Sequence, residues 1–327
     1  MMQRRILLAA LILGASFAPG LSAQEAATTP AASVSHDAAV QQAAGVPERV
    51  DIITPHITDS HSLELPCFKP GWACHYELPR WAPMHIGGLT IDLSPTKHVV
   101  FLWIAAALCL LLLIGAARSS RRAKPDDAPR GVPNGVEAVV LYLRNEVIIP
   151  NVGHHGDRYV PFVLTLFFFI MFANILGLVP YGSTATGNIS VTAVLAILTF
   201  IVVEVAGMRA LGRKYIGTIV FWPHDMPLAM KLPMTLIMTP VELLGKFTKP
   251  FALAIRLFAN MTAGHVIVLA LIGMIFTFGS MFIGLVVFPF IMALAIMLLE
   301  LFVAFLQAFI FALLTSVFIG QIREAAH

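Results

Sequence analysis

Three apolar runs in the middle of the chain have the length of membrane-spanning helices. They are Val99 to Ala117, Tyr159 to Pro180 and Asn188 to Met208, and a helix needs about 20 apolar residues to cross a bilayer. The only charged residue within them is Glu204. Glu204 lies about one turn from the end of its run, so we interpret it as a side chain that snorkels to the interface. The pattern predicts three crossings in this part of the chain.

Two longer runs make up the last third of the chain. One extends from about Thr235 to Phe278, and the other continues after Gly279-Ser280 to about Ile322. Each has roughly 40 residues, or about 60 Å of helix, whereas the hydrocarbon core is about 30 Å thick. Either each run breaks into pieces, or the two form a long, tilted antiparallel hairpin. With one crossing each, the sequence predicts an all-α membrane protein with about five transmembrane helices.

The segments between the runs predict surface elements and an orientation. Val136 to Ile149 is too short and too charged to cross, and its apolar positions favour an amphipathic helix on the inner surface. Tyr215 to Pro233 contains three prolines, which should break a helix. By the positive-inside rule, basic residues place the end of the first run in the cytoplasm; they are Arg118, Arg121, Arg122, Lys124 and Arg130. Five crossings then leave the N-terminal part outside and the C-terminus in the cytoplasm.

The N-terminal part predicts an exported extension. Residues 1–23 have the features of a signal peptide, because Arg4 and Arg5 precede an apolar run and Ala23 suits the position before cleavage. An uncleaved anchor is the alternative. Residues 24–97 form a polar, periplasmic extension, and its segment Glu77 to Ser94 favours a short β-hairpin. Residues 98–327 form the membrane domain.

Two cysteines lie in this extension. Cys67 and Cys74 are placed to form a disulfide outside the cytoplasm or to remain thiols. A metal site that also uses His61 and His75 is the weaker alternative, because the spacing matches no zinc pattern.

The scarcity of charge supports the membrane assignment. Charged residues make up 12% of the 327 residues, against roughly 25% in soluble domains. The apolar content of 58% and the mean hydropathy of +0.84 also exclude a disordered chain. The net charge of +3 and the lack of a basic stripe give no indication of nucleic-acid binding.

Two isolated charges mark the last two runs as functional. Arg256 and Glu300 are the only permanent charges between Pro250 and Ile322, and a charge inside an apolar helix is costly to bury. Snorkelling explains Arg256 poorly, since Lys246 and Lys249 already mark the water interface one to two turns earlier.

Two polar pairs in these runs predict a single hairpin. In an antiparallel hairpin, facing residues have a nearly constant sum of sequence numbers, and two pairs satisfy this with midpoints beside the proposed turn: Arg256 with Gln307, and His265 with Glu300. Asn260 shares the face of Arg256, whereas His265 lies half a turn away. The hairpin therefore has two predicted polar zones.

The chemistry of these groups suggests proton movement. Arginine stays protonated, so Arg256 cannot relay protons, but it can hold a carboxylate ionised. His265 and Glu300 can exchange protons. No Asp or Glu of this chain is placed to pair with Arg256 within the membrane. The residues predict a proton path that is interrupted by a fixed cation and completed by the carboxylate of another subunit.

The stretch from Lys249 to Gly264, KPFALAIRLFANMTAG, resembles the signature of subunit a of the F-type rotary ATP synthase. Leu306 to Phe311 and residues 158–180 are similar to further blocks of this family, and the resemblance extends from about Ile91 to the C-terminus. It implies a non-enzymatic proton-channel subunit of a bacterial inner membrane, without cofactor or metal. The implied partners are the c-subunit ring, which the hairpin faces, the b-subunit peripheral stalk, the rest of the complex and lipid.

The resemblance also implies roles for single residues. Arg256 would be the fixed arginine facing the ring, with Gln307 and Asn260 as polar neighbours, and Glu242 would line the cytoplasmic half-channel. Two departures are present. Ala259 stands where many members have Gly, and the relay order is His265 then Glu300, which interchanges the order of well-known bacterial members.

Three other functions fit less well. A secondary transporter usually shows internal repeats, which are absent from the sequence. An intramembrane hydrolase would need a nucleophile or metal motif, such as H-E-x-x-H or G-x-S-x-G, and neither occurs. A purely structural anchor would leave Arg256 unexplained. The transported ion, H⁺ or Na⁺, stays open, because the selecting carboxylate belongs to the partner.

Overall fold

The computed structural model describes residues 58–66, 73–82, 84–86, 89–92, 94–122, 131–153, 156–179, 182–219, 227–278 and 283–324. The predicted signal peptide, the proposed turn at Gly279-Ser280 and Cys67 lie outside these residues. The long helices are α4 (Lys97–Arg122), α7 (Val160–Leu178), α8 (Ile189–Leu211), α9 (Leu228–Phe278) and α10 (Ile283–Glu324).

Five helical segments in the described residues are long and apolar enough to cross a membrane. They are Lys97–Arg121, Val160–Leu178, Ile189–Thr218, Leu232–Ile275 and Val286–Arg323. The predicted all-α architecture with five spans is therefore confirmed. The tilt of the last two helices and the side that faces a partner remain predictions.

The core of the bundle lies between α7, the C-terminal half of α10 and the helices packed around them. Helix α7 is apolar all round, so it is buried on several sides, and it packs against both α4 and α10. Phe167 of α7, Leu257 of α9 and Phe311 of α10 are all fully buried in one apolar cluster. This packing fixes α9 and α10 against the rest of the protein.

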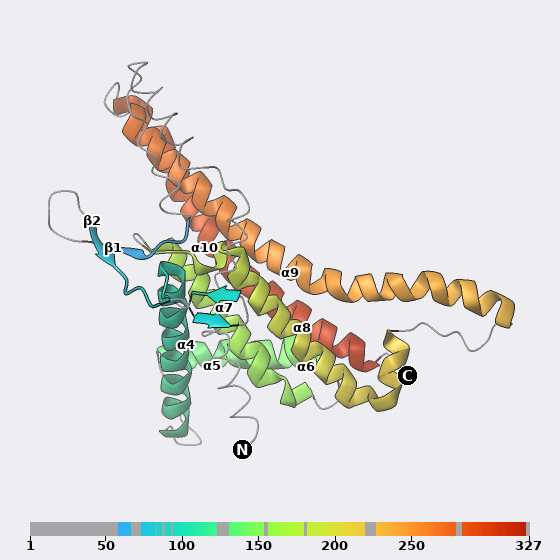
Figure 1. The fold of residues 1–327 in the computed structure, drawn as a ribbon. Helices are drawn as coiled ribbons and strands as arrows, with labels where there is room; N and C mark the ends of the chain where they lie inside the picture. Colours follow the sequence, from blue (N-terminus) through green and yellow to red (C-terminus); the bar gives the residue numbers. More distant parts are fainter. Residues whose placement is uncertain are drawn as a thin grey trace, which may run out of the picture.

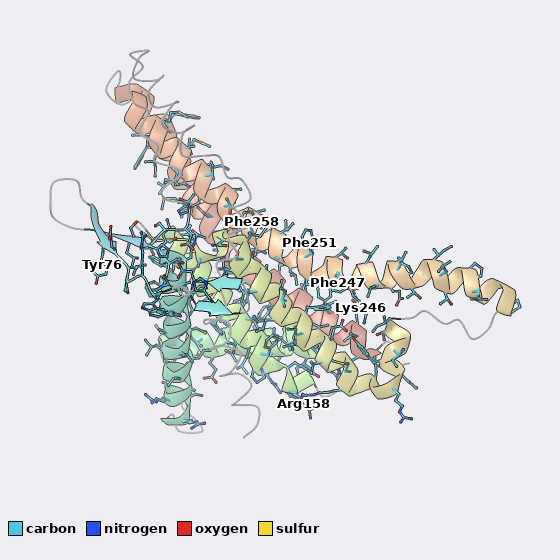
Figure 2. All side chains as sticks on the ribbon, in the orientation of Figure 1. Tyr76, Arg158, Lys246, Phe247, Phe251 and Phe258 are labelled. Atoms are coloured by element: carbon cyan, nitrogen blue, oxygen red, sulfur yellow. The ribbon has the colours of Figure 1, made fainter. Side chains whose placement is uncertain are left out.

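The last two helices are each continuous, so the alternative of broken runs is wrong. Helix α9 has 51 residues and α10 has 42. The prediction that Pro233 lies outside a helix is also wrong, because α9 begins at Leu228. A helix can pass a proline by bending, since only one hydrogen bond is lost and packing neighbours compensate. Figure 1 shows α9 changing direction, and in Figure 2 Phe247 and Phe251, on either side of Pro250, lie near the bend.

A transverse helical segment connects α4 to α7. It comprises α5 (Val132–Tyr142), the π-helical segment η1 (Leu143–Ile148) and α6 (Ile149–Val152), and it lies across the direction of α4 (Figure 1). The predicted helix from Val136 to Ile149 is thus present, with longer ends and a π-helical interior.

The end of this segment touches α10 at the level of the backbone. A Cβ atom added to Gly320 would lie 1.9 Å from the carbonyl oxygen of Asn151. Arg323 Nη1 donates a hydrogen bond of 2.9 Å to the carbonyl of Val152. Only glycine allows so close an approach, so α6 holds the C-terminal end of α10.

The described part of the extension contains two antiparallel hairpins. Strand β1 (Ser62–Pro66) pairs with β2 (Ala73–Glu77), and β3 (Met84–Ile86) pairs with β4 (Leu89–Ile91). The second lies within the predicted range from Glu77 to Ser94 and confirms it, whereas the first was not predicted. No metal-binding cluster is found among the described residues.

An ion pair joins the segment before β1 to the start of α4. Asp59 Oδ1 lies 3.2 Å from Nδ1 of the buried His98 near the start of α4, and the Lys97 amide donates to the Ser60 carbonyl at 2.9 Å. Burial raises the pKa of Asp59, but the hydrogen bond and charge of His98 outweigh it, so the pKa lies below the usual 3.8.

Acid is expected to loosen this attachment. Because the folded-state pKa of Asp59 is lowered, its contribution is complete above the unfolded value and is lost as the pH falls below about 4. Cleavage of the extension by pepsin, an acid-active protease, should therefore accelerate severalfold between pH 4.5 and pH 3. Asp59→Asn should be cleaved fast at both values. A wild-type rate that does not change over this range, after correction for pepsin activity, would contradict the prediction.

Candidate functional site

Arg256 lies on an exposed, apolar side of α9. Its neighbours Leu253 and Leu257 are buried in the core, whereas Arg256 itself is exposed, as are Phe251 and Ile255. Arg256 forms no hydrogen bond or ion pair with any other described residue. A guanidinium on an apolar surface is costly to desolvate without an anionic or polar partner.

Asn260 and Gln307 join α9 to α10 one turn away from Arg256. Asn260 Nδ2 donates to Gln307 Oε1 at 3.1 Å. Gln307 is almost fully buried, and its Nε2 has no hydrogen-bond partner among the described residues. The predicted pairing of Gln307 with Arg256 is thus replaced by pairing with Asn260, which shares the face of Arg256.

His265 and Glu300 lie together, as the sequence predicted. His265 Nδ1 is 3.9 Å from Glu300 Oε1, and the Glu300 side chain is only 5% exposed. Gly264 provides the space for this carboxylate, since a Cβ atom there would lie 2.8 Å from Glu300 Oε1. The cross-helix pairs Asn260–Gln307 and His265–Glu300 fit one antiparallel register of α9 and α10.

A buried polar group that sequence analysis missed lies near this pair. Thr186 Oγ1, in η3 (Ala185–Gly187), donates to Asn174 Oδ1 of α7 at 2.7 Å. Asn174 Nδ2 donates in turn to the carbonyl of Ala304, one turn after Glu300 on α10, at 3.2 Å. Both polar side chains are fully buried. Their spacing in sequence gave no signal, because they come from different elements.

A cavity of about 290 Å³ lies between the C-terminal halves of α8 and α10 and the N-terminal half of α9. Glu242 lines it, and this residue is exposed and without a hydrogen bond or ion pair to another described residue. Lys249 is also in its wall and donates to Gln321 of α10 at 3.1 Å. The polar residues of α9 and α10 thus lie in three places: this cavity, the surface around Arg256 and the His265–Glu300 pair.

The interpretation of Glu204 as a snorkelling side chain is wrong. Its side chain is only 14% exposed, and its carboxylate lies 3.3 Å from Lys246 Nζ. Tyr215 also donates a hydrogen bond to this carboxylate. Tyr215 belongs to η4 (Gly212–Thr218), a turn of helix that folds back beside α8 after Gly212. Gly212 has φ of 56°, a conformation that favours glycine, and this reversal of the chain could not be read from the apolar pattern.

Comparison with known proteins gives consistent matches. Residues 99–320 match the family described as ATP synthase A chain. The chain is 42% identical over 295 residues to ATP synthase subunit a of Anaeromyxobacter dehalogenans, which covers 89% of this chain and 75% of that protein. It is also 42% identical to ATP synthase subunit a 2 of Chlorobium luteolum, over 98% of this chain and 95% of that protein. The subunit a of Chloroherpeton thalassium is 45% identical, over 84% and 77%.

Proposed function

Because the chain belongs to the ATP synthase A chain family, we propose that it carries protons past a rotating ring through two half-channels separated by Arg256. Members of this family are the non-catalytic, proton-translocating a subunit of the ATP synthase complex, so the chain is not itself an enzyme. Its five candidate spans make it a multi-pass membrane subunit.

The observation that carries the proposal is the isolation of Arg256. It is exposed on an apolar helix surface and has no ionic partner among the described residues. A carboxylate of the c-subunit ring would pair with it, and the attraction would keep that carboxylate ionised. The fixed positive charge would also block direct passage of protons between the two half-channels.

The two half-channels would lie on either side of this arginine. Protons would enter past His265 and Glu300, which are both able to exchange them, and would load the carboxylate of the ring. After rotation they would leave through the cavity that Glu242 lines. Asn260 and Gln307 would place polar groups beside the arginine.

The proposal includes the organisation of the chain and its orientation in the membrane. Residues 1–23 would be a signal peptide, 24–97 a periplasmic extension and 98–327 the channel domain in a bacterial inner membrane. The C-terminus would lie in the cytoplasm, and the b-subunit stalk would hold the subunit against the ring.

Glu242→Gln tests the exit path. The purified complex is reconstituted into vesicles, and ATP synthesis is measured after an acid–base jump. Synthesis should be at least about tenfold slower in this variant, because a proton-exchanging group of the exit path is lost. Co-purification of a small two-helix subunit with a mid-membrane Asp or Glu would test the partner in the same sample. A normal rate would contradict the role of Glu242, and the absence of such a subunit would contradict the ring.

A further inference from the structure

Lys246 pairs with a different residue from the one that helix geometry favours. It lies one turn after Glu242 on α9, and a Glu followed by a Lys four residues later is the preferred arrangement for a helical ion pair. Both residues line the same cavity. Yet no ion pair joins them within the described residues, and Lys246 Nζ lies instead 3.3 Å from Glu204 of α8.

Several contacts hold Lys246 in this direction. Its Nζ donates to Thr218 Oγ1 at 3.0 Å and lies 4.7 Å from the centre of the Tyr215 ring. Tyr215 also donates to the same Glu204 oxygen that faces the ammonium. Figure 2 shows Lys246 on the side of α9 that faces the ends of α8 and α10. Glu204 and η4 together therefore form a receptor for the ammonium group.

We propose that Glu204 is a positioning residue that holds Lys246 away from Glu242 and so leaves Glu242 free to accept and release protons. The inference rests on the proposed role of Glu242 in the exit half-channel and adds a reason why a lysine is tolerated one turn from it. Glu204 itself carries no proton in this scheme, because it stays paired with the ammonium.

The physical reason is the cost of an unpaired, mostly buried charge. The Lys246 side chain is only 17% exposed, and an ammonium group at such a site needs an anionic or polar partner. Without Glu204, the flexible lysine would turn to the nearest carboxylate along its own helix, which is Glu242. The resulting pair would favour ionised Glu242 and oppose its protonation.

The test is a double-mutant cycle on proton-driven ATP synthesis by the reconstituted complex. Glu204→Gln should lower the rate about tenfold, in line with coupling of about 1.4 kcal/mol within an ion-pair network. Lys246→Gln combined with Glu204→Gln should restore the rate to that of Lys246→Gln alone. Such a rescue is not expected if Glu204 only supports the fold, because the second substitution removes a further contact between α8 and α9.

Two more variants serve as controls for assembly and for the loss of an unrelated ion pair. Glu204→Asp keeps a carboxylate on α8 and should retain most of the activity, while the subunit content of each purified complex shows whether it assembles. Asp157→Asn is the matched control, since it removes the acid of the exposed Arg144–Asp157 pair outside the cavity, and it should leave the rate unchanged.

The outcomes separate this inference from the function on which it rests. A slow Glu242→Gln variant with a normal Glu204→Gln variant would overturn only the inference. A double variant as slow as Glu204→Gln would also overturn it, because Glu204 would then be needed even without the lysine. A normal Glu242→Gln variant would overturn the proposed role of Glu242 and the inference together.

Discussion

Replacement of Arg256 by Ala is expected to abolish proton-driven ATP synthesis, with a loss of at least about a hundredfold, equivalent to about 3 kcal/mol of lost electrostatic interaction. The exposed guanidinium has no ionic partner among the described residues, so its proposed partner is the carboxylate of the ring. Without Arg256, that carboxylate would no longer be held ionised beside the stator, and protons would pass between the half-channels without rotation. ATP synthesis after an acid–base jump measures the first effect, and passive proton leak through the assembled membrane sector measures the second.

Two further variants make the result specific. Arg256→Lys keeps a positive charge but loses the planar, always protonated guanidinium, so it should also be slow and should leak less than Arg256→Ala. Arg144→Ala removes an arginine from an exposed ion pair, and exposed pairs contribute little, so it should behave as wild type. A normal rate of synthesis in Arg256→Ala would contradict the proposed function, and tolerance of Arg256→Gln would favour a purely structural anchor.

Exchange of His265 and Glu300 should preserve more proton flux than loss of either residue. The two side chains lie 3.9 Å apart, so the double variant His265→Glu with Glu300→His keeps one acid and one imidazole in contact. Single replacement by Ala should slow ATP-driven proton pumping about tenfold or more, whereas the exchanged pair should lose about threefold, because only its geometry changes.

The comparison among these variants shows whether His265 and Glu300 act together in proton transfer. Gly264 leaves space for a carboxylate at position 300, and a histidine there needs more room, which accounts for the partial loss. If the exchanged pair is as slow as both single variants, although all three assemble in equal amounts, the two residues do not act together.

The features that could be predicted from the sequence are those that depend on composition and on the spacing of residues along the chain. Five apolar runs gave five spans, because the length of a crossing helix is set by the bilayer. The pairing of His265 with Glu300 was predicted because the sequence numbers of facing residues in an antiparallel hairpin have a nearly constant sum. In the structure, His265 Nδ1 lies 3.9 Å from Glu300 Oε1. Pro233 was misjudged, since a rule for soluble helices was applied to a long helix that continues past a proline.

Features that depend on several distant elements were not accessible from the sequence. The environment of Glu204 is created by η4, which returns to α8 after the turn at Gly212. The hydrogen bonds of Asn174 join three elements far apart in the chain. In both cases the hydrogen-bond partners come from other elements, so the spacing of residues along one helix does not indicate them.

The close contact between Gly320 and Asn151 has a mechanical consequence. In the proposed function, a ring that turns against α9 and α10 would exert a sideways load on α10, and the subunit would have to resist that load. The approach of two backbones, with no flexible side chain between them at Gly320 and with Arg323 bonded to Val152, is a stiff connection. Torque applied to α10 would therefore pass into the transverse segment of α5, η1 and α6, which would act as a brace lying across the direction of the spanning helices.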